Sequence, residues 1–180
     1  MSEQGTVTLR PLTEADTANI VRWRNSESVR KNLYTQAELT EQQHLNYFKN
    51  VVQAGKCAQY IIIVSENGNQ HHIGTVFIKS IDRENRKGEF GMFIGEDRFR
   101  GKGYAVPTVK QILEIAFSEL GLNRVYLTAM ADNEPAIRAY EKAGFVKEGL
   151  MKEDFLRCDG YVDIVVMGIT AKKWRERKGE

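Results

Sequence analysis

A basic loop with two glycines, Arg98–Ala105, has the residue types that bind phosphate. It follows a predicted strand, Glu89–Ile94, and precedes a predicted helix, Val106–Leu120. The first turn of a helix leaves backbone N–H groups unpaired, and the helix dipole places partial positive charge there. Gly101 and Gly103 have no side chains, so phosphate oxygens could approach the backbone closely. The alternative is a solvated basic turn, but the strand before the loop and the helix after it favour a phosphate site.

The elements that must position this loop can be predicted from the spacing of apolar residues. The helix after the loop carries one apolar face and ends before Gly121, a residue typical of helix ends: Val109, Ile112, Leu113, Ala116, Phe117 and Leu120. Before the loop, two capping boxes, Thr13 with Asp16 and Thr40 with Gln43, predict the starts of two helices.

The remaining segments alternate or run apolar as strands do. The predicted strands are Val7–Arg10, Gln59–Ser65, Ile73–Ile81, Glu89–Ile94, Arg124–Met130, Val146–Leu156 and Tyr161–Ile169, with a hairpin turn at Asn67-Gly68. A further helix is predicted from Asn133, a suitable N-cap, to about Lys142, and the charged tail Ala171–Glu180 is expected to fray. This order predicts an α+β fold, with a mixed, mostly antiparallel sheet flanked by helices.

Composition bounds the class of protein and its partners. The chain has 180 residues, of which 42% are hydrophobic and 28% charged, so we expect one domain over residues 1–180. A net charge of +2 argues against a nucleic-acid partner. Cys57 and Cys158 have no metal-ligand or redox spacing, which predicts unpaired thiols, no metal and a reducing cytoplasm.

We also expect no contact with a membrane. No apolar run approaches the roughly 18 residues of a membrane span, and the opening MSEQGTVTLR is not typical of a signal peptide. A cytoplasmic protein is therefore expected. Nothing in the sequence decides between a monomer and a homodimer.

Two motifs together resemble a known family. RFRGKGYA, from Arg98, resembles the R/Q-x-x-G-x-G/A signature of the GCN5-related N-acetyltransferase (GNAT) superfamily. NEPAIRAYEKAGF, from Asn133, resembles that superfamily's later block of Asn, Tyr and Gly-Phe. The resemblance extends from Thr8 to about Trp174, and LRPLTEAD, WRN and the long C-terminal hairpin are similar to the RimJ/RimL-type branch. It implies a GNAT fold and an acetyl-CoA-dependent N-acetyltransferase.

The resemblance implies acetyl-CoA as co-substrate, with its pyrophosphate on the amides of the basic loop. Its pantetheine arm would lie between Glu89–Ile94 and Arg124–Met130, where a backbone N–H would polarise the thioester carbonyl. Gly91 either forms a bulge that directs this N–H or only relieves crowding. The residues expected to contact acetyl-CoA are Met92, Phe93, Ile94, Arg98, Phe99, Arg100, Gly101, Lys102, Gly103, Tyr104 and Asn133.

The resemblance also implies two catalytic residues. Tyr140 would protonate the departing thiolate, and Glu89 would accept the proton of the attacking amine, directly or through water. Three alternatives stay open at this point. Tyr140 could only pack on the sheet, Glu89 could be solvated with ordered water as the base, and Asn133 could only cap its helix.

The acceptor site is expected between Arg22–Phe48 and the C-terminal hairpin. That stretch resembles the amino-sugar-nucleotide acetyltransferases of the pseudaminic-acid pathway, which makes an amino-sugar nucleotide the expected acceptor. The resemblance implies that Arg24 and His44 bind the diphosphate and that Tyr34 or Tyr47 stacks on the base. Alternatively, Arg24 forms a surface ion pair and His44 lies on a helix surface.

Other acceptors and one other class of function remain open. The N-terminal amine of a protein is the RimJ/RimL-like alternative. A polyamine, as in the spermidine acetyltransferases, requires a cluster of carboxylates. The acceptor region instead mixes both signs of charge: Glu27, Glu38 and Glu41 with Arg22, Arg24, Arg30 and Lys31. A non-catalytic acyl-CoA sensor would be expected to have lost Tyr140, Asn133 or the glycine loop.

Overall fold

A computed structural model describes residues 5–179 of the chain, and within them seven strands form one sheet in the order β1-β2-β3-β4-β5-β7-β6. Neighbouring strands are antiparallel except for the parallel pair β4–β5. The strands are β1 Thr6–Pro11, β2 Ala58–Glu66, β3 Asn69–Asp82, β4 Lys87–Ile94, β5 Arg124–Met130, β6 Val146–Arg157 and β7 Gly160–Thr170. The predicted fold class, a mixed and mostly antiparallel sheet with flanking helices, is confirmed.

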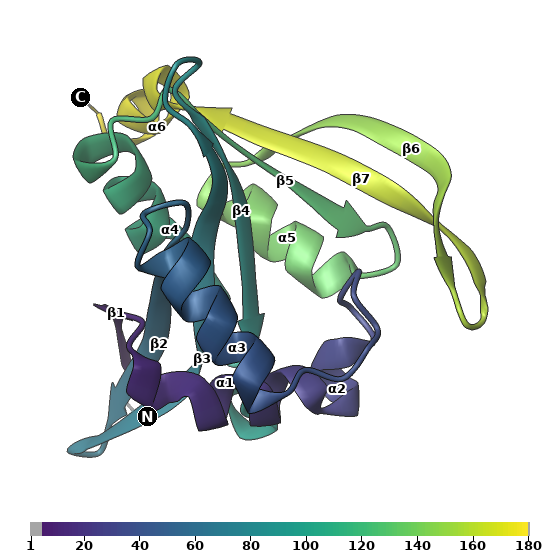
Figure 1. The fold of residues 1–180 in the computed structure, drawn as a ribbon. Helices are drawn as coiled ribbons and strands as arrows, with labels where there is room; N and C mark the ends of the chain where they lie inside the picture. Colours follow the sequence, from purple (N-terminus) through teal and green to yellow (C-terminus); the bar gives the residue numbers. More distant parts are fainter. Residues whose placement is uncertain (1–4, 180) are drawn as a thin grey trace.

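The helices cover the sheet on both faces (Figure 1). They are α1 Thr17–Asn25, α2 Glu27–Arg30, α3 Glu41–Tyr47, α4 Ala105–Glu114, α5 Glu134–Ala143 and α6 Ala171–Lys178. The short 3-10 turn η1 Glu14–Asp16 precedes α1, and a second 3-10 turn, η3 Asp97–Phe99, leads into the glycines of the basic loop. Two of the helices continue as π-helical turns: α3 through η2 Phe48–Val52, and α4 through η4 Ile115–Glu119.

The interior strand β2 shows how the two faces of the sheet are filled. Ile62 and Val64 belong to the cluster of α4 and α5, whereas Ile61 and Ile63 belong to the cluster of α1 and η2. Successive side chains of a strand point to opposite faces, so a continuous apolar run is what a strand with two covered faces requires. Burying each such side chain contributes about 1.5–3 kcal/mol.

The parallel pair β4–β5 is unusually short. Its register contains only three pairs: Lys87↔Arg124, Gly88↔Val125 and Glu89↔Tyr126. Beyond Glu89 the two strands separate, as Figure 1 shows, and β5 continues in register with β7 alone. Within residues 5–179, no strand therefore pairs with this edge of β4 from Phe90 to Ile94.

One sequence-based expectation is wrong, and the structure decides between the two interpretations of Gly91. The tail does not fray in the described residues but forms α6, because the Trp174 ring is buried and its Nε1 donates to Glu114 Oε2 at 3.1 Å. Gly91 does not form a bulge, since the β3–β4 register is regular there. A Cβ on Gly91 would lie 2.5 Å from the Phe77 ring, so this glycine relieves crowding.

The start of the helical layer depends on a buried carboxylate, Asp16, which completes the predicted capping box with Thr13. Asp16 accepts from Arg10 Nη1 and Nη2 at 3.0 and 2.7 Å, and from Thr13 N at 2.8 Å. Burial alone raises the pKa of Asp16, but the hydrogen bonds from Arg10 and Thr13 lower it overall. A lowered folded-state pKa stabilises the fold above the ordinary Asp range, and this contribution is lost as the pH falls through the lowered pKa.

We predict that Asp16→Asn lowers the free energy of unfolding by about 2 kcal/mol near neutral pH, because it leaves charged donors without their acceptor. The difference between variant and parent should shrink as the pH falls below the ordinary Asp range and through the lowered pKa of Asp16, where the parent carboxylate also becomes protonated. Urea unfolding at several pH values measures this difference. Glu14→Gln is the control, since Glu14 belongs to the same turn but is exposed. An equal loss at every pH would contradict the electrostatic explanation.

Candidate active site

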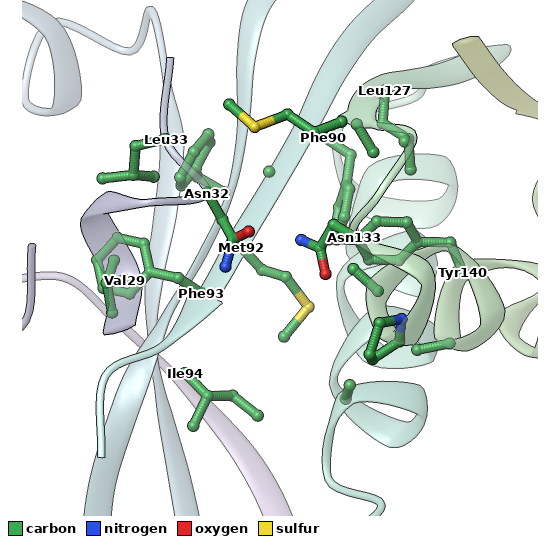
Figure 2. Close-up of a pocket in the computed structure, with 18 of the residues that line it drawn as sticks. Val29, Asn32, Leu33, Phe90, Met92, Phe93, Ile94, Leu127, Asn133 and Tyr140 are labelled. Atoms are coloured by element: carbon green, nitrogen blue, oxygen red, sulfur yellow. The ribbon is translucent and has the colours of Figure 1, made fainter. Parts of the chain in front are cut away.

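A cleft of about 1250 Å³ opens where β4 and β5 separate. It is lined by α1 to α3 on one side, by the unpaired edge of β4 and the basic loop, and by β5 and α5 on the other side. Figure 2 shows the side chains of Met92 and Phe90 from β4 facing Tyr140 and Asn133 from the α5 side. The separation of two strands thus creates a deep space in the middle of the sheet.

The register of β3 and β4 decides which β4 amides face this cleft. Hydrogen-bonded and non-hydrogen-bonded pairs alternate along an antiparallel ladder. Gly95 N donates to Ile73 O at 2.7 Å, so Phe93, two residues earlier, also directs its N–H toward β3. Met92 and Ile94 therefore direct theirs toward the cleft. Of the backbone N–H groups of Met92, Phe93 and Ile94, those of Met92 and Ile94 can therefore donate to a ligand in the cleft.

The basic loop has a backbone that only glycine adopts readily at two positions. Gly101 and Gly103 have φ of 70° and 87°, and α4 begins directly after them at Ala105. Side chains at these positions would be strained, and Gly101 has open space around it. The loop residues that line the cleft are Arg100, Gly101, Gly103, Tyr104 and Ala105.

The basic side chains of the loop divide into two groups. Arg100 Nε and Nη2 donate to Ile94 O at 2.9 and 2.6 Å, and its Nη1 donates to Ser28 O at 2.9 Å, so Arg100 links the end of β4 to α2. Arg98 and Lys102 instead lie over the ring of Phe99, which is 1% exposed. Arg98, Phe99 and Lys102 do not line the cleft, although all three were expected to contact the cofactor.

Tyr140 lies on α5 at the floor of the cleft. Its ring meets Phe90 edge to face at 5.3 Å between centroids, and burial raises its pKa. A phenol with a raised pKa keeps its proton and can donate it. Tyr140 therefore both packs on the sheet and faces the cleft, so the two interpretations of this residue are compatible.

Asn133 precedes α5, but its side chain makes no capping hydrogen bond. The expected capping role is therefore not seen. In Figure 2 the amides of Asn133 and Asn32 point into the cleft from opposite sides. Asn32, in the segment between α2 and α3, has no sequence signal beyond its polarity and was missed.

Glu89 is on the other face of the sheet from Tyr140, because its neighbour Phe90 packs on the Tyr140 ring. It forms an ion pair with Lys79 at 3.2 Å and lines the cleft. Tyr34 reaches across from the segment after α2, and its hydroxyl donates to Thr128 Oγ1 on β5 at 2.9 Å. Burial and then the charge of Glu89 raise the pKa of Tyr34.

Arg24, His44 and Tyr47 come together on the α1–α3 side of the cleft, while Tyr34 lies apart from them near β5. His44 is 2% exposed, so the helix-surface alternative is wrong. Arg24 is half-buried and, among residues 5–179, has no carboxylate within ion-pair distance, so the surface ion pair is also wrong. Gln59 of β2 joins this group. A glutamine at the head of an otherwise apolar strand was the signal that sequence reasoning overlooked.

Other kinds of site have no support in the part of the chain that the structure describes. No group of three or more His, Cys, Asp or Glu residues there could hold a metal ion. No helix in that part is long and apolar enough to cross a membrane. Cys57 is buried and Cys158 exposed, and both are free thiols.

Comparison with known proteins identifies the family. The acetyltransferase (GNAT) domain family matches residues 6–146, and the chain belongs to it. Its fold is that of a spermidine N-acetyltransferase from Vibrio cholerae solved in complex with CoA and spermine. The TM-score is 0.85 at 25% identity, over 93% of this chain and 97% of that one. Another structure of that relative is dodecameric, with a TM-score of 0.79 at 25% identity, over 95% and 97% of the two chains.

Curated relatives cover only part of the chain. The spermidine N(1)-acetyltransferase of Vibrio cholerae serotype O1 is 32% identical over 114 residues, which are 63% of this chain and 65% of that protein. The L-amino acid N-acetyltransferase AaaT of Escherichia coli K12 is 32% identical over 93 residues, 52% of this chain and 57% of that protein. The match therefore spans less than two thirds of either relative. These relatives do not single out the RimJ/RimL-type branch or the pseudaminic-acid pathway.

We predict that Arg100→Gln lowers the free energy of unfolding by about 2 kcal/mol, because it removes three hydrogen bonds that hold the end of β4 against α2. Arg98→Gln is the matched variant in the same loop. It loses an exposed contact with His71 and the Phe99 ring and should cost less than about 1 kcal/mol. Denaturant unfolding of both variants distinguishes them, and equal losses would show that Arg100 does not brace the cleft.

Proposed function

We propose that the protein transfers an acetyl group from acetyl-CoA to the primary amine of a small molecule. The observation that carries this proposal is the unpaired edge of β4, with the amides of Met92 and Ile94 facing a cleft that ends at the glycine loop. An extended pantetheine arm can pair with such an edge as a further strand would. The positive φ at Gly101 and Gly103 turns the loop backbone toward the start of α4, where phosphate binds.

The residues of the cleft divide the chemistry between the two faces of the sheet. Tyr140, whose phenol is protonated at neutral pH and faces the cleft, donates its proton to the departing thiolate. The N–H of Met92 or Ile94 stabilises the oxyanion that forms when the amine attacks the carbonyl. Glu89, on the opposite face and paired with Lys79, accepts the proton of the amine directly or through water. The amine therefore approaches from the α1–α3 side.

Asn133 and Tyr104 have supporting roles in this proposal. The uncapped amide of Asn133 remains free to hydrogen-bond the pantetheine arm from the α5 side. Tyr104, buried beneath the loop, donates to Glu66 Oε2 at 3.0 Å and fixes the start of α4. Arg98 and Lys102 add positive charge at the loop rim, and direct contact with phosphate would require them to leave the Phe99 ring.

The names of the two relatives described above suggest two classes of acceptor. The spermidine N-acetyltransferases support a polyamine, which the sequence had left as an alternative. The amino acid acetyltransferase AaaT supports an amine that also carries a carboxylate. The amino-sugar nucleotide that the sequence suggested has no support among these relatives. The charges of the α1–α3 side distinguish the two remaining classes.

The first prediction of this proposal concerns cofactor binding. Acetyl-CoA should raise the melting temperature, because a ligand at one hundred times its Kd stabilises the native state by about 2.7 kcal/mol. Gly103→Val should abolish most of this shift, since valine at φ 87° is strained and its side chain crowds the phosphate path. Differential scanning calorimetry with and without acetyl-CoA measures both. No shift in the parent at millimolar acetyl-CoA would refute the cofactor assignment.

The second prediction concerns catalysis. Tyr140→Phe should lower kcat by roughly 100-fold, within the range for loss of a general acid. The shift of the melting temperature with acetyl-CoA should persist, because the packing of the ring on Phe90 is retained. Release of free CoA thiol gives kcat, and the control is Tyr161→Phe, a tyrosine of β7 that is 64% exposed and lies outside the cleft. An unchanged kcat in the Tyr140 variant would remove this residue from the mechanism.

A further inference from the structure

Three buried side-chain polar atoms have no hydrogen-bond partner in the described part of the chain: Arg24 Nε, His44 Nε2 and Gln59 Oε1. All three residues line the cleft, on the α1–α3 side of the sheet. Leaving a buried donor or acceptor unpaired costs about 1–3 kcal/mol, so three such atoms around one cleft call for a ligand that pairs with them.

The orientation of Gln59 is set by its neighbours. The Thr75 hydroxyl donates to Tyr60 O at 2.8 Å, so its oxygen can only accept from Gln59, at 3.1 Å. The amide nitrogen of Gln59 must therefore face Thr75. The amide oxygen Oε1 of Gln59 then faces the cleft, where it can accept a hydrogen bond.

His44 presents the complementary group. Its Nδ1 lies 3.0 Å from Thr17 Oγ1, the one contact of that hydroxyl among the hydrogen bonds of the described residues. If Thr17 donates to Nδ1, both groups are satisfied and the proton of the neutral ring is on Nε2. Burial, and to a lesser extent the charge of Arg24, lower the pKa of His44 against the opposing effect of Asp16, so the ring is neutral near pH 7. His44 Nε2–H then faces the cleft as a donor.

Arg24 supplies the charge. Burial lowers its pKa, yet a guanidinium stays protonated at neutral pH. Burial raises the pKa of the adjacent Tyr47 phenol, which therefore stays neutral, and Glu89, an acid that lines this side, is already paired with Lys79. The positive charge of Arg24 is therefore uncompensated in the cleft.

We propose that Arg24, His44 and Gln59 bind an anionic oxygen group, a carboxylate or phosphate, on the acceptor molecule. Arg24 Nε–H and His44 Nε2–H donate to its oxygens, and Gln59 Oε1 accepts an N–H or O–H beside it. The inference rests on the proposed function and names its substrate class: amines that also carry an acid group. A polyamine would place a second ammonium beside an unpaired guanidinium, which Coulomb repulsion disfavours.

The sheet register gives the spacing between the two ends of such an acceptor. Gln59 pairs with Phe77, and Phe77 pairs with Gly91 on β4, beside the amides that would hold the thioester. Two strand spacings separate Gln59 from Gly91, or roughly 10 Å. The acceptor is therefore extended, with its reacting amine several bonds away from its acid group.

A matched set of acceptors of similar chain length tests the inference in the parent protein. δ-Aminovalerate, pentylamine and cadaverine carry the same reacting amine and end in a negative, neutral and positive group. We expect kcat/KM to fall in that order, by about 10-fold or more from first to last. δ-Aminobutylphosphonate in place of δ-aminovalerate distinguishes a phosphate site from a carboxylate site. Spermidine is included as the acceptor of the named relatives.

Arg24→Gln should raise KM for δ-aminovalerate by about 10- to 100-fold, the loss expected for a charged hydrogen bond, and so lower the preference for δ-aminovalerate over pentylamine by a similar factor. Pentylamine turnover also shows that the variant is folded. Arg22→Gln is the control on the same helix, because Arg22 pairs with Glu96 outside the cleft. If cadaverine or spermidine is the best acceptor, or Arg24→Gln leaves the order unchanged, the inference is overturned. If no amine is acetylated at all, the proposed function itself fails.

Discussion

The site depends on one constraint, the separation of β4 from β5 after Glu89. A strand edge without a partner leaves backbone N–H and C=O groups unpaired, which is costly away from water. The chain compensates part of this cost itself, because Arg100 donates twice to the Ile94 carbonyl. The backbone N–H and C=O of Met92, which face the cleft, have neither a strand partner nor a side-chain partner among the interactions described for β4. The fold thus keeps hydrogen-bonding capacity in place for an extended ligand.

A gap through a sheet also gives one cleft two chemically different sides. On the α5 side, Tyr140 is packed among aromatic rings and holds its proton. On the α1–α3 side, Glu89 is in an ion pair with Lys79. Placed on the same side, a phenol and a carboxylate would hydrogen-bond to each other and leave fewer groups for a ligand. The sheet keeps them apart while both reach the same central space.

Features set by local sequence were predictable, whereas features set by tertiary contact were not. The capping boxes at Thr13 and Thr40 and the strand Arg124–Met130 were predicted correctly, because each depends on residues adjacent in sequence. The tail was wrong because Trp174 finds a distant partner in Glu114. In the basic loop, the glycines adopt the backbone that the motif predicts. Phe99, however, is buried in the core, and Arg98 and Lys102 lie over its ring. The motif therefore predicts the backbone of this loop better than the placement of its side chains.

The acceptor is the feature that the sequence predicts least well, because it depends on how charges pair in the folded protein. Counting charges along Arg22–Phe48 yields a mixture of signs that cannot distinguish a polyamine from an acidic amine. In the fold, Glu38 pairs with Arg30 and Arg22 pairs with Glu96, so these charges cancel at the surface. Arg24 alone of the helix α1 arginines turns into the cleft, where burial strengthens its field because little water screens it. Which charges stay unpaired after folding depends on tertiary packing, and the order of residues along the chain does not show it.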